Sequence, residues 1–321
     1  MEHRMYLSLA AVVALVVLVV YRAGIWLLAR ARAANKPLLA RCAGWGLLVA
    51  VTSLLTALTL RRNKLYRSDL FIWEDTVSKQ PDNARALSNY GVALVNVGRL
   101  PEARVRLEKA LSLKPDYPDA RSNLGACFGK MGKFEEAVQE LRKAIKVKPN
   151  HPDAQRNLSV ALMNLGQLDE AIKHAKLALY YNPYYPEAEN TWGNCLFKKG
   201  LYDEAAEHYR AALQLKPDFA EAYSNLGGIS DHKGKPEEAI EYYRKALQIK
   251  PDFPEAHSNL ASALTKIGSH KEAVAHCEAA LQLNPKFPMA HNNCGEALAA
   301  LGRVDEAIQH YQEAVRQDPN Y

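Results

Sequence analysis

The sequence predicts an all-α protein built from stacked pairs of helices. Three regularities predict it: a fixed period, small residues at fixed positions, and a glycine and a proline that recur in every period. Eight prolines stand 34 residues apart, at positions 81, 115, 149, 183, 217, 251, 285 and 319. A helix–turn–helix unit has about this length, and such units bury their apolar faces by stacking on copies of themselves.

Counted from Ala84, the chain contains seven units, and three positions of each unit hold a small residue. The units are 84–117, 118–151, 152–185, 186–219, 220–253, 254–287 and 288–321. The eighth position holds Gly91, Gly125, Ser159, Gly193, Gly227, Ala261 and Gly295, and the twentieth and twenty-seventh positions are alanine in every unit. Small residues at these spacings predict close approach of two helices within a unit. Larger residues such as Leu107 and Tyr243 are expected to fill the gaps between units.

Each unit also contains signals for where its helices begin and end. A central glycine is expected to form the turn between the two helices, at Gly98, Gly132, Gly166, Gly200, Gly234, Gly268 and Gly302. The periodic proline ends the second helix, and in five units another proline begins the first helix. This pattern resembles the tetratricopeptide repeat (TPR). The resemblance implies a right-handed superhelical solenoid of seven repeats.

The amino-terminal segment has a different character, because it contains two long uncharged runs. The first begins at residue 6 and continues through Arg22, and the second covers residues 42–60. Both are long enough to cross a bilayer. We therefore predict a transmembrane hairpin over 1–62, with spans at about 6–28 and 42–60 and a basic loop at 30–41. A signal peptide is the alternative for the first run, but no small-residue cleavage site follows it.

The distribution of charge predicts which side of the membrane the repeats occupy. Residues 1–67 carry a net charge of +9, whereas the remaining residues carry −3. The basic loop favours a cytoplasmic position for the loop and extracytoplasmic repeats, although four basic residues after the second run favour the reverse. We expect an integral membrane protein of a bacterial inner membrane or the endoplasmic reticulum membrane. A cytoplasm-facing assembly module is an alternative, and the mildly acidic repeats exclude a nucleic-acid surface.

The two ends of the repeat array are expected to differ. Residues 63–83 form a linking half-repeat, with a helix over 68–80 that covers the open face of the first repeat. At the other end, Ile308, Tyr311 and Val315 repeat the apolar stripe that earlier units bury, yet no further unit follows. Such an uncovered stripe predicts truncation, self-association or a partner there.

A second resemblance involves short motifs that flank the two apolar runs. Glu2-His3-Arg4-Met5-Tyr6-Leu7 precedes the first run, and Arg62, Asn63 and Tyr66 follow the second. In this order along the chain, the motifs resemble the carboxy-terminal part of the transmembrane-and-TPR protein O-mannosyltransferases and their bacterial relatives. The resemblance implies an extracytoplasmic TPR array in a protein O-glycosylation system, with a glycosyltransferase catalytic subunit as a possible partner.

The chain departs from that family in its catalytic part. The family's catalytic acidic residues lie in the first extracytoplasmic loop of a many-span domain, and this chain has only Glu2 before Asp69. No phosphate-binding loop, G-x-S-x-G or HExxH motif is present. We therefore predict no catalytic residue, no cofactor and no enzymatic activity of this chain alone. A fragment of an active glycosyltransferase is the alternative.

The residues expected to bind a partner lie at the sixth position of each unit, on the inner side of the first helix. Asparagine occupies six of the seven positions and threonine the other: Asn89, Asn123, Asn157, Thr191, Asn225, Asn259 and Asn293. An amide both donates and accepts hydrogen bonds, so a row of amides can pair with the backbone of an extended peptide of any sequence. A similar row holds substrate polypeptide in the nucleocytoplasmic N-acetylglucosamine transferase. The alternative is that these amides serve helix packing.

Aromatic residues mark a second candidate surface at the junction of the third and fourth units. Tyr180, Tyr181 and Tyr184 lie near Trp192, while Tyr185 occupies the position that joins one unit to the next. The three additional tyrosines either form an interface or a sugar-stacking surface, or fill space at an irregular junction.

Cysteine and histidine positions argue against a metal site. Cys277 and Cys294 fall where neighbouring units meet, and we expect two buried thiols there rather than a disulfide. Four histidines recur at the twenty-third position, at His174, His208, His276 and His310. Equivalent positions in neighbouring units are about 10 Å apart, which is too far for two histidines to share a metal. We interpret these histidines as a solvated face.

Overall fold

The structure of the protein is a computed structural model that describes residues 21–26, 29–30, 50–56 and 68–319. The chain divides into two compact units, Met1–Pro81 and Asp82–Tyr321. In the first unit, residues 21–26, 29–30 and 50–56 are helical, and helix α3 covers Asp69–Lys79. Helix α3 lies within the segment 68–80 for which the sequence predicts a helix; its role as a cover for the first repeat stays a prediction.

The predicted transmembrane hairpin falls largely outside the described residues. Its two spans, at about 6–28 and 42–60, are described only over 21–26 and 50–56. Among the helices that the structure describes, none combines the length and the apolar character that a bilayer requires. The hairpin therefore stays a prediction.

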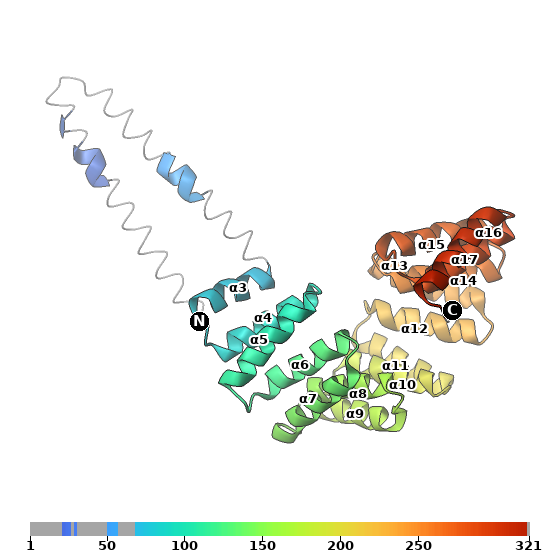
Figure 1. The fold of residues 1–321 in the computed structure, drawn as a ribbon, viewed down its shortest axis with the longest axis horizontal. Helices are drawn as coiled ribbons and strands as arrows, with labels where there is room; N and C mark the ends of the chain where they lie inside the picture. The colour runs from blue at the N-terminus through green and yellow to red at the C-terminus, as the bar shows by residue number, and fades with distance from the viewer. Residues whose placement is uncertain (1–20, 27–28, 31–49, 57–67, 320–321) are drawn as a thin grey trace. The chain divides into compact units, whose positions relative to one another are not determined.

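The second unit consists of seven helix pairs, which we call helix A and helix B of repeats 1 to 7 (Figure 1). The A helices are α4 (Ala84–Asn96), α6 (Pro118–Lys130), α8 (Pro152–Asn164), α10 (Pro186–Lys198), α12 (Ala220–His232), α14 (Pro254–Lys266) and α16 (Pro288–Ala300). The B helices are α5 (Leu100–Leu113), α7 (Phe134–Val147), α9 (Leu168–Tyr181), α11 (Tyr202–Leu215), α13 (Pro236–Ile249), α15 (His270–Leu283) and α17 (Val304–Gln317). The predicted all-α solenoid is confirmed.

A glycine with a left-handed backbone forms the turn between helices A and B in every repeat. The seven φ angles lie between 69° and 81°, at Gly98, Gly132, Gly166, Gly200, Gly234, Gly268 and Gly302. Glycine adopts this conformation without the steric cost that a Cβ atom imposes. The same turn therefore recurs in each repeat, and the following B helix begins two residues later.

The glycine at the eighth position lies beneath a large side chain from helix B of its own repeat. A Cβ atom added to Gly227 would lie 2.7 Å from the Tyr243 ring, and the corresponding distances at the other four such glycines are 2.5–2.6 Å. The partners at these glycines are Leu107, Leu141, Tyr209, Tyr243 and Tyr311. The sequence predicts these side chains in the gaps between repeats. They instead pack first within their own repeat, and Tyr243 also joins a core cluster that includes Leu260 of the next.

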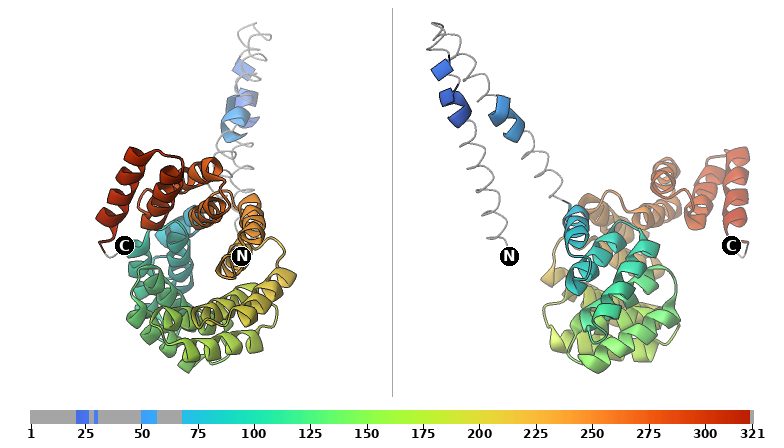
Figure 2. Two further views of the ribbon diagram at one scale, coloured as in Figure 1. Left: turned by 90° about the vertical axis from the view of Figure 1, so that its right-hand side faces the viewer. Right: turned by 60° about the vertical axis from the view of Figure 1, so that its left-hand side comes forward.

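The array curves because the A helices lie closer together than the B helices. Each A helix packs against the A helix of the next repeat, whereas consecutive B helices make no comparable contact within the described residues. Side chains of consecutive A helices therefore face a common inner side. Figure 2 shows α4 to α17 following this curved path.

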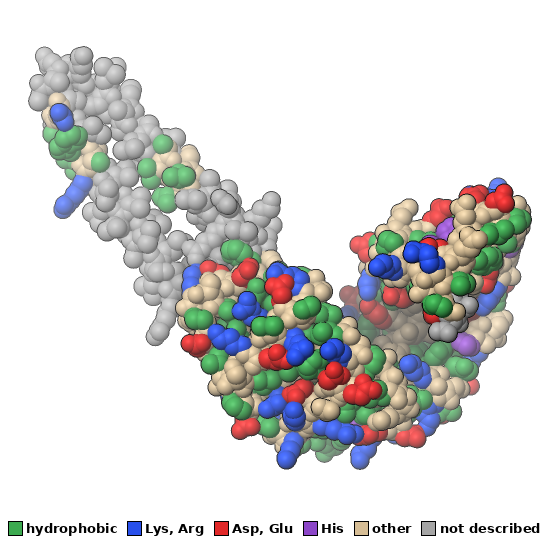
Figure 3. Space-filling model, in the orientation of Figure 1, with side chains coloured by type: hydrophobic (Ala, Val, Ile, Leu, Met, Phe, Trp, Pro, Cys, Tyr) green, Lys and Arg blue, Asp and Glu red, His purple; other side chains and the backbone are tan. Residues whose placement is uncertain are grey.

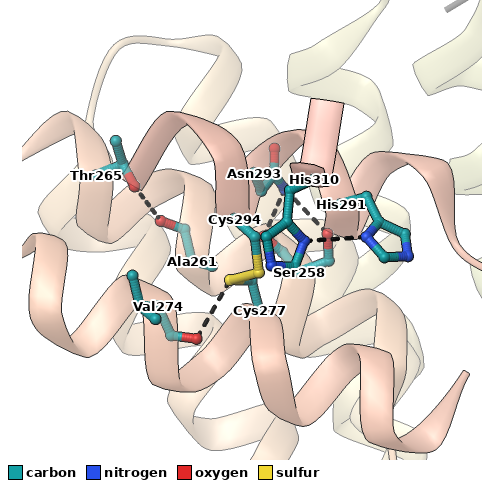
Figure 4. The surroundings of a disulfide bond; sticks show 9 residues. All are labelled: Ser258, Ala261, Thr265, Val274, Cys277, His291, Asn293, Cys294 and His310. Carbon is teal, nitrogen blue, oxygen red and sulfur yellow. Dashed lines mark hydrogen bonds between the residues drawn. A yellow bond between two sulfur atoms is a disulfide. The ribbon is translucent and has the colours of Figure 1, made fainter. Parts of the chain in front are cut away.

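The structure contains a disulfide where the sequence analysis predicts two free thiols. Cys277 in α15 and Cys294 in α16 are bonded, with their Cα atoms 5.5 Å apart (Figure 4). The prediction of free thiols is therefore wrong. Each cysteine occupies a buried position at which helix B of repeat 6 meets helix A of repeat 7, and the helix packing brings the two Cα atoms within bonding range. Cys127 and Cys195 are buried and free.

The last helix of the array exposes part of the stripe that was predicted to be uncovered. Ile308 is 46% exposed and Val315 is 50% exposed. Tyr311 differs, because it lies over Gly295 and packs against the core cluster that extends from repeat 5 to repeat 7. Self-association through this end stays a prediction.

Candidate peptide-binding surface

The asparagines at the sixth position lie where consecutive A helices meet. Asn123 donates a hydrogen bond from Nδ2 to Ser88 Oγ at 3.1 Å, and Asn157 donates to Ser122 Oγ at 3.4 Å. In both cases the acceptor belongs to the fifth position of the preceding repeat. The row of amides therefore contributes to packing between repeats.

The same connection recurs in the later repeats with small changes. Asn225 donates to the Oδ1 atoms of both Asn190 and Asn194 at 2.9 Å. Asn293 donates to the Ser258 backbone oxygen and to its Oγ, also at 2.9 Å. Each of these bonds joins the amide to helix A of the preceding repeat and so fixes the orientation of the amide group.

Three members of the row behave differently. Thr191 is buried and donates its hydroxyl hydrogen to the Glu187 backbone oxygen at 2.7 Å, so it faces its own helix. Asn89 and Asn259 are half-buried, and neither side chain makes a hydrogen bond to the described part of the chain. These two amides retain their full capacity to bind a partner.

The amides that hold neighbouring helices also keep unused capacity. A carboxamide has two N–H groups and an oxygen with two lone pairs, so one donated bond leaves most of its capacity free. Among the amides that bond to the preceding A helix, only that of Asn157 has an oxygen that accepts a hydrogen bond from the described residues. The donor is Arg156, at 2.6 Å. The oxygens of Asn123 and Asn225, both half-buried, have no such partner. Packing and peptide binding are therefore compatible at these positions.

Tyr185 directly precedes α10 of repeat 4 and bonds to two residues of α8 in repeat 3, so it joins the two repeats. Its hydroxyl donates to Asp153 Oδ1 at 2.5 Å and accepts from Arg156 Nε at 2.9 Å. Burial of the phenol raises the pKa of Tyr185 to about 12. The hydroxyl thus remains a donor throughout the physiological pH range.

The side chains of Tyr180 and Tyr184 are exposed and do not fill the junction between repeats 3 and 4. They are 77% and 82% exposed, and the ring of Tyr181 meets that of Tyr180 edge to face at 5.3 Å. The other repeats have polar or charged residues at both positions, for example Gln214 and Asp218 in repeat 4. The fold does not require aromatic side chains there. The interpretation of Tyr180 and Tyr184 as filler is therefore wrong.

Trp192 does not share the exposure of these tyrosines. Its ring stacks on His208 with 3.8 Å between the ring centroids, and Lys176 Nζ lies 4.9 Å from the ring. It packs against the core cluster around Leu196 and Tyr209. The structure therefore assigns Trp192 to packing between repeats 3 and 4.

A pair of polar side chains connects helices A and B within most repeats, and the sequence analysis missed it. The pair joins the fourth and twenty-third positions, which are 19 residues apart. It is Arg121–Glu140 in repeat 2, Gln155–His174 in repeat 3, Glu189–His208 in repeat 4, His257–His276 in repeat 6 and His291–His310 in repeat 7. The distances range from 2.6 to 3.0 Å.

The histidines at the twenty-third position are therefore not a solvated face. The side chain of His174 is 12% exposed and that of His276 is 25% exposed. Burial lowers the pKa of both, and also that of His310, because it disfavours the charged imidazolium. For His276 and His310 the paired histidine lowers the pKa further.

Charged side chains of both signs are interspersed over the face of the repeats shown in Figure 3. Many pair between neighbouring repeats, as Lys199 does with Asp169 at 2.6 Å and Arg142 with Glu170 at 2.9 Å. Within the described residues, no group of three or more His, Cys, Asp or Glu side chains could hold a metal ion.

Comparison with known families agrees with the repeat geometry. Models of the tetratricopeptide repeat match residues 93–132, 130–190, 190–254 and 259–321. The repeats are tetratricopeptide repeats. No curated protein gives a significant match to the sequence.

Two solved structures have the same TPR fold. One is the Cut9–Hcn1 hetero-tetramer of the APC/C, with a TM-score of 0.64, 22% identity and coverage of 74% of this chain. The match spans 46% of that longer chain. The other is PilF of Pseudomonas aeruginosa, with a TM-score of 0.55, 24% identity and coverage of 64% of this chain and 93% of PilF. At these identities the likeness concerns the fold alone.

Proposed function

We propose that the TPR solenoid is a protein-binding scaffold that holds an extended polypeptide along the inner side formed by its A helices. The single observation that supports this most is the row of sixth-position amides. Successive amides occupy equivalent places one repeat apart, and hydrogen bonds to the preceding helix orient four of them. A pre-oriented row loses little side-chain entropy when it binds, so more of the interaction energy appears as affinity.

The row suits the backbone of a peptide rather than a particular sequence. Peptide groups present one donor and one acceptor per residue, and free amide oxygens and N–H groups can pair with them in either direction. Half-buried amides at Asn123 and Asn225 remain accessible to such a ligand. The proposed client is therefore an unfolded or extended protein segment.

Removing the two amides without protein partners should separate binding from packing. We expect Asn89→Ala/Asn259→Ala to weaken peptide capture at least fivefold, because each lost amide removes a hydrogen bond of about 1 kcal/mol. Stability should change by no more than about 0.5 kcal/mol, since neither side chain bonds to the described protein. Fluorescence anisotropy with an unstructured peptide measures the first quantity, and thermal unfolding measures the second.

Asn123→Ala provides the matched comparison. Its side chain bonds to Ser88, so this change should lower both affinity and stability. If Asn89→Ala/Asn259→Ala captured the peptide as well as the unchanged protein, the amides would serve packing alone and the proposal would fail.

We further propose that the scaffold is anchored in a membrane and works outside the cytoplasm. The two apolar runs and the basic loop between them support the anchor. The Cys277–Cys294 disulfide supports a location of the repeats outside the cytoplasm, because disulfides persist in oxidising environments and are rare in the cytosol. It favours this topology over a cytoplasm-facing assembly module.

Labelling of an introduced cysteine tests this topology. In a Cys42→Ala background, Asp218→Cys places one thiol in an exposed loop, while the native Cys127 and Cys195 are fully buried. A membrane-impermeant maleimide added to the extracytoplasmic side should label Asp218→Cys within minutes and leave the parent protein unlabelled. Labelling of Asp218→Cys only from the cytoplasmic side would contradict the proposal.

The proposed client is a polypeptide undergoing O-glycosylation by a separate catalytic chain. The motifs around Arg4 and Asn63 support this, through their resemblance to the protein O-mannosyltransferases. In this scheme the solenoid presents the acceptor and a partner supplies the catalytic carboxylates. Sugar transfer by the purified chain alone would contradict this division and favour a fragment of an active transferase.

A further inference from the structure

The polar pair between helices A and B changes its chemistry in the last two repeats. The pairs in repeats 2 to 4 contain at most one histidine. In repeat 6 two imidazoles face each other instead, with 3.0 Å between the Nδ1 atoms of His257 and His276. His291 and His310 form a pair with the same distance in repeat 7, and Figure 4 shows it beside the disulfide.

The surroundings of His257 show where the hydrogens of the first pair lie. Its Nε2 atom lies 3.1 Å from the Pro251 backbone oxygen, which can only accept, so Nε2 carries the hydrogen. The Nδ1 atom of the neutral ring is therefore the acceptor, and His276 Nδ1 donates to it. A first proton, added at His276 Nε2, leaves this bond in place because Nδ1 of the charged ring still donates.

A second proton cannot be accommodated in this geometry. It would bind His257 Nδ1, and two N–H groups would then face each other across 3.0 Å. The hydrogen bond would be replaced by repulsion between two cations. The rings must then separate. Because His257 lies on helix A and His276 on helix B, the two helices must separate with them.

Two charged side chains of opposite sign act on the first pair. Burial lowers the pKa of His276 most, and the second imidazole lowers it further. Glu272 of α15 raises this pKa and Arg244 of α13 lowers it, so the two partly offset each other. The uptake of protons by this pair is therefore disfavoured mainly by its burial and by the pairing itself.

The second pair has acidic neighbours. Glu278 of α15 and Glu306 of α17 raise the pKa of His310, and Glu313 of α17 interacts electrostatically with His291. Burial and the paired imidazole outweigh the two carboxylates, so the pKa of His310 is still lowered. Both pairs thus resist protonation in the folded state.

We propose that repeats 6 and 7 open at mildly acidic pH, before the earlier repeats do. In an unfolded chain each histidine takes up a proton near pH 6.5, whereas each folded pair accommodates one proton at most. The folded state therefore binds fewer protons, and its stability is fully present above about pH 6.5 and falls as the pH decreases below that value. One proton excluded from each pair multiplies the ratio of open to closed repeats by about ten for every pH unit.

Native-state hydrogen exchange at pH 7.5 and at pH 5.0 tests the proposal on the oxidised full chain. After correction for the intrinsic exchange rate, we expect the opening constant of amides in α14 to α17 to rise by about tenfold or more on acidification. The opening constant of amides in α6 and α7 should change by less than about threefold, because the pair in repeat 2 contains no histidine.

Repeat 3 supplies a matched replacement for the first pair. Gln155 Nε2 donates to the Pro149 backbone oxygen at 2.9 Å, and His257 makes the equivalent bond in repeat 6. His257→Gln should therefore retain the fold. An amide oxygen accepts a bond from a neutral and from a charged imidazole alike, so this variant should suppress the acid effect in α14 and α15.

The reverse change should create acid sensitivity where the chain lacks a histidine pair. Gln155→His places a second imidazole opposite His174, and the opening constant in α8 and α9 should then rise by about tenfold between pH 7.5 and pH 5.0. An equal rise in all repeats, or an acid effect that persists unchanged in His257→Gln/His291→Gln, would overturn the proposal.

Discussion

Reduction of the Cys277–Cys294 disulfide is expected to lower the stability of the last repeats by about 3 kcal/mol. The bond closes a loop with a sequence separation of 17 residues, and a cross-link of this span removes about that much conformational free energy from the unfolded chain. In a solenoid, stability is approximately a sum of repeat and interface contributions. The loss should therefore concentrate at the interface between repeats 6 and 7, where the bond lies.

Native-state hydrogen exchange distinguishes this local loss from a general one. On reduction, the opening free energy of amides in α16 and α17 should fall by about 3 kcal/mol, while that of amides in α6 to α9 stays unchanged. In Cys277→Ala/Cys294→Ala, the reductant should have no effect, because Cys127 and Cys195 form no disulfide. An equal loss in all repeats would show that the bond does not act at this interface.

The fold follows from the sequence because each repeat contains its own signals. The turn glycines and the prolines depend on local backbone geometry, which short-range chemistry determines. Gly234, for example, has φ = 69° and separates α12 from α13. The same signals recur seven times without insertion, so an error in one repeat would have been corrected by the others.

The polar pairs between helices A and B could not be recognised in the same way. Their members are 19 residues apart, and whether they touch depends on how the two helices cross. The sequence does contain complementary residues at these positions, because position 4 of repeat 2 is the basic Arg121 and position 23 is the acidic Glu140. Comparing complementary residues across all repeats, rather than each position alone, would have found it.

The disulfide was missed for a related reason. Position within the repeats places Cys277 and Cys294 at one interface, but a bond also requires a Cα separation of about 4.4–6.8 Å and suitable direction. Periodicity alone provides neither the Cα separation nor the direction of the side chains.

The sequence leaves the role of the sixth-position amides open between packing and binding. The observed bonds from Asn123 and Asn225 show that packing is one of their roles.

Replacement of two adjacent glycines in α12 by alanine, one at a time, is expected to change the stability of the protein in opposite directions. Glycine in a helix interior costs about 0.5–1 kcal/mol relative to alanine, so Gly228→Ala should stabilise the protein by about that amount. At Gly228 an added Cβ atom meets only Tyr243 Oη, at 3.9 Å. At Gly227 it would lie 2.7–3.0 Å from three ring carbons of Tyr243, which is only 2% exposed and cannot move aside. Overpacking of this kind costs about 1–3 kcal/mol and outweighs the helical gain.

Chemical denaturation of Gly227→Ala and Gly228→Ala therefore should give unfolding free energies that differ by about 2–3 kcal/mol, with the unchanged protein between them. The clash is tested by a double-mutant cycle with Tyr243→Ala. Once the ring is absent, Gly227→Ala should become neutral or stabilising, because only the helical preference remains. In repeat 3, Ser159 occupies the position of Gly227 and Ala175 occupies the position of Tyr243. A larger residue at the eighth position is therefore compatible with the fold when its partner on helix B is small. Destabilisation by Gly227→Ala that persisted without the ring would place its origin in the backbone and not in this contact.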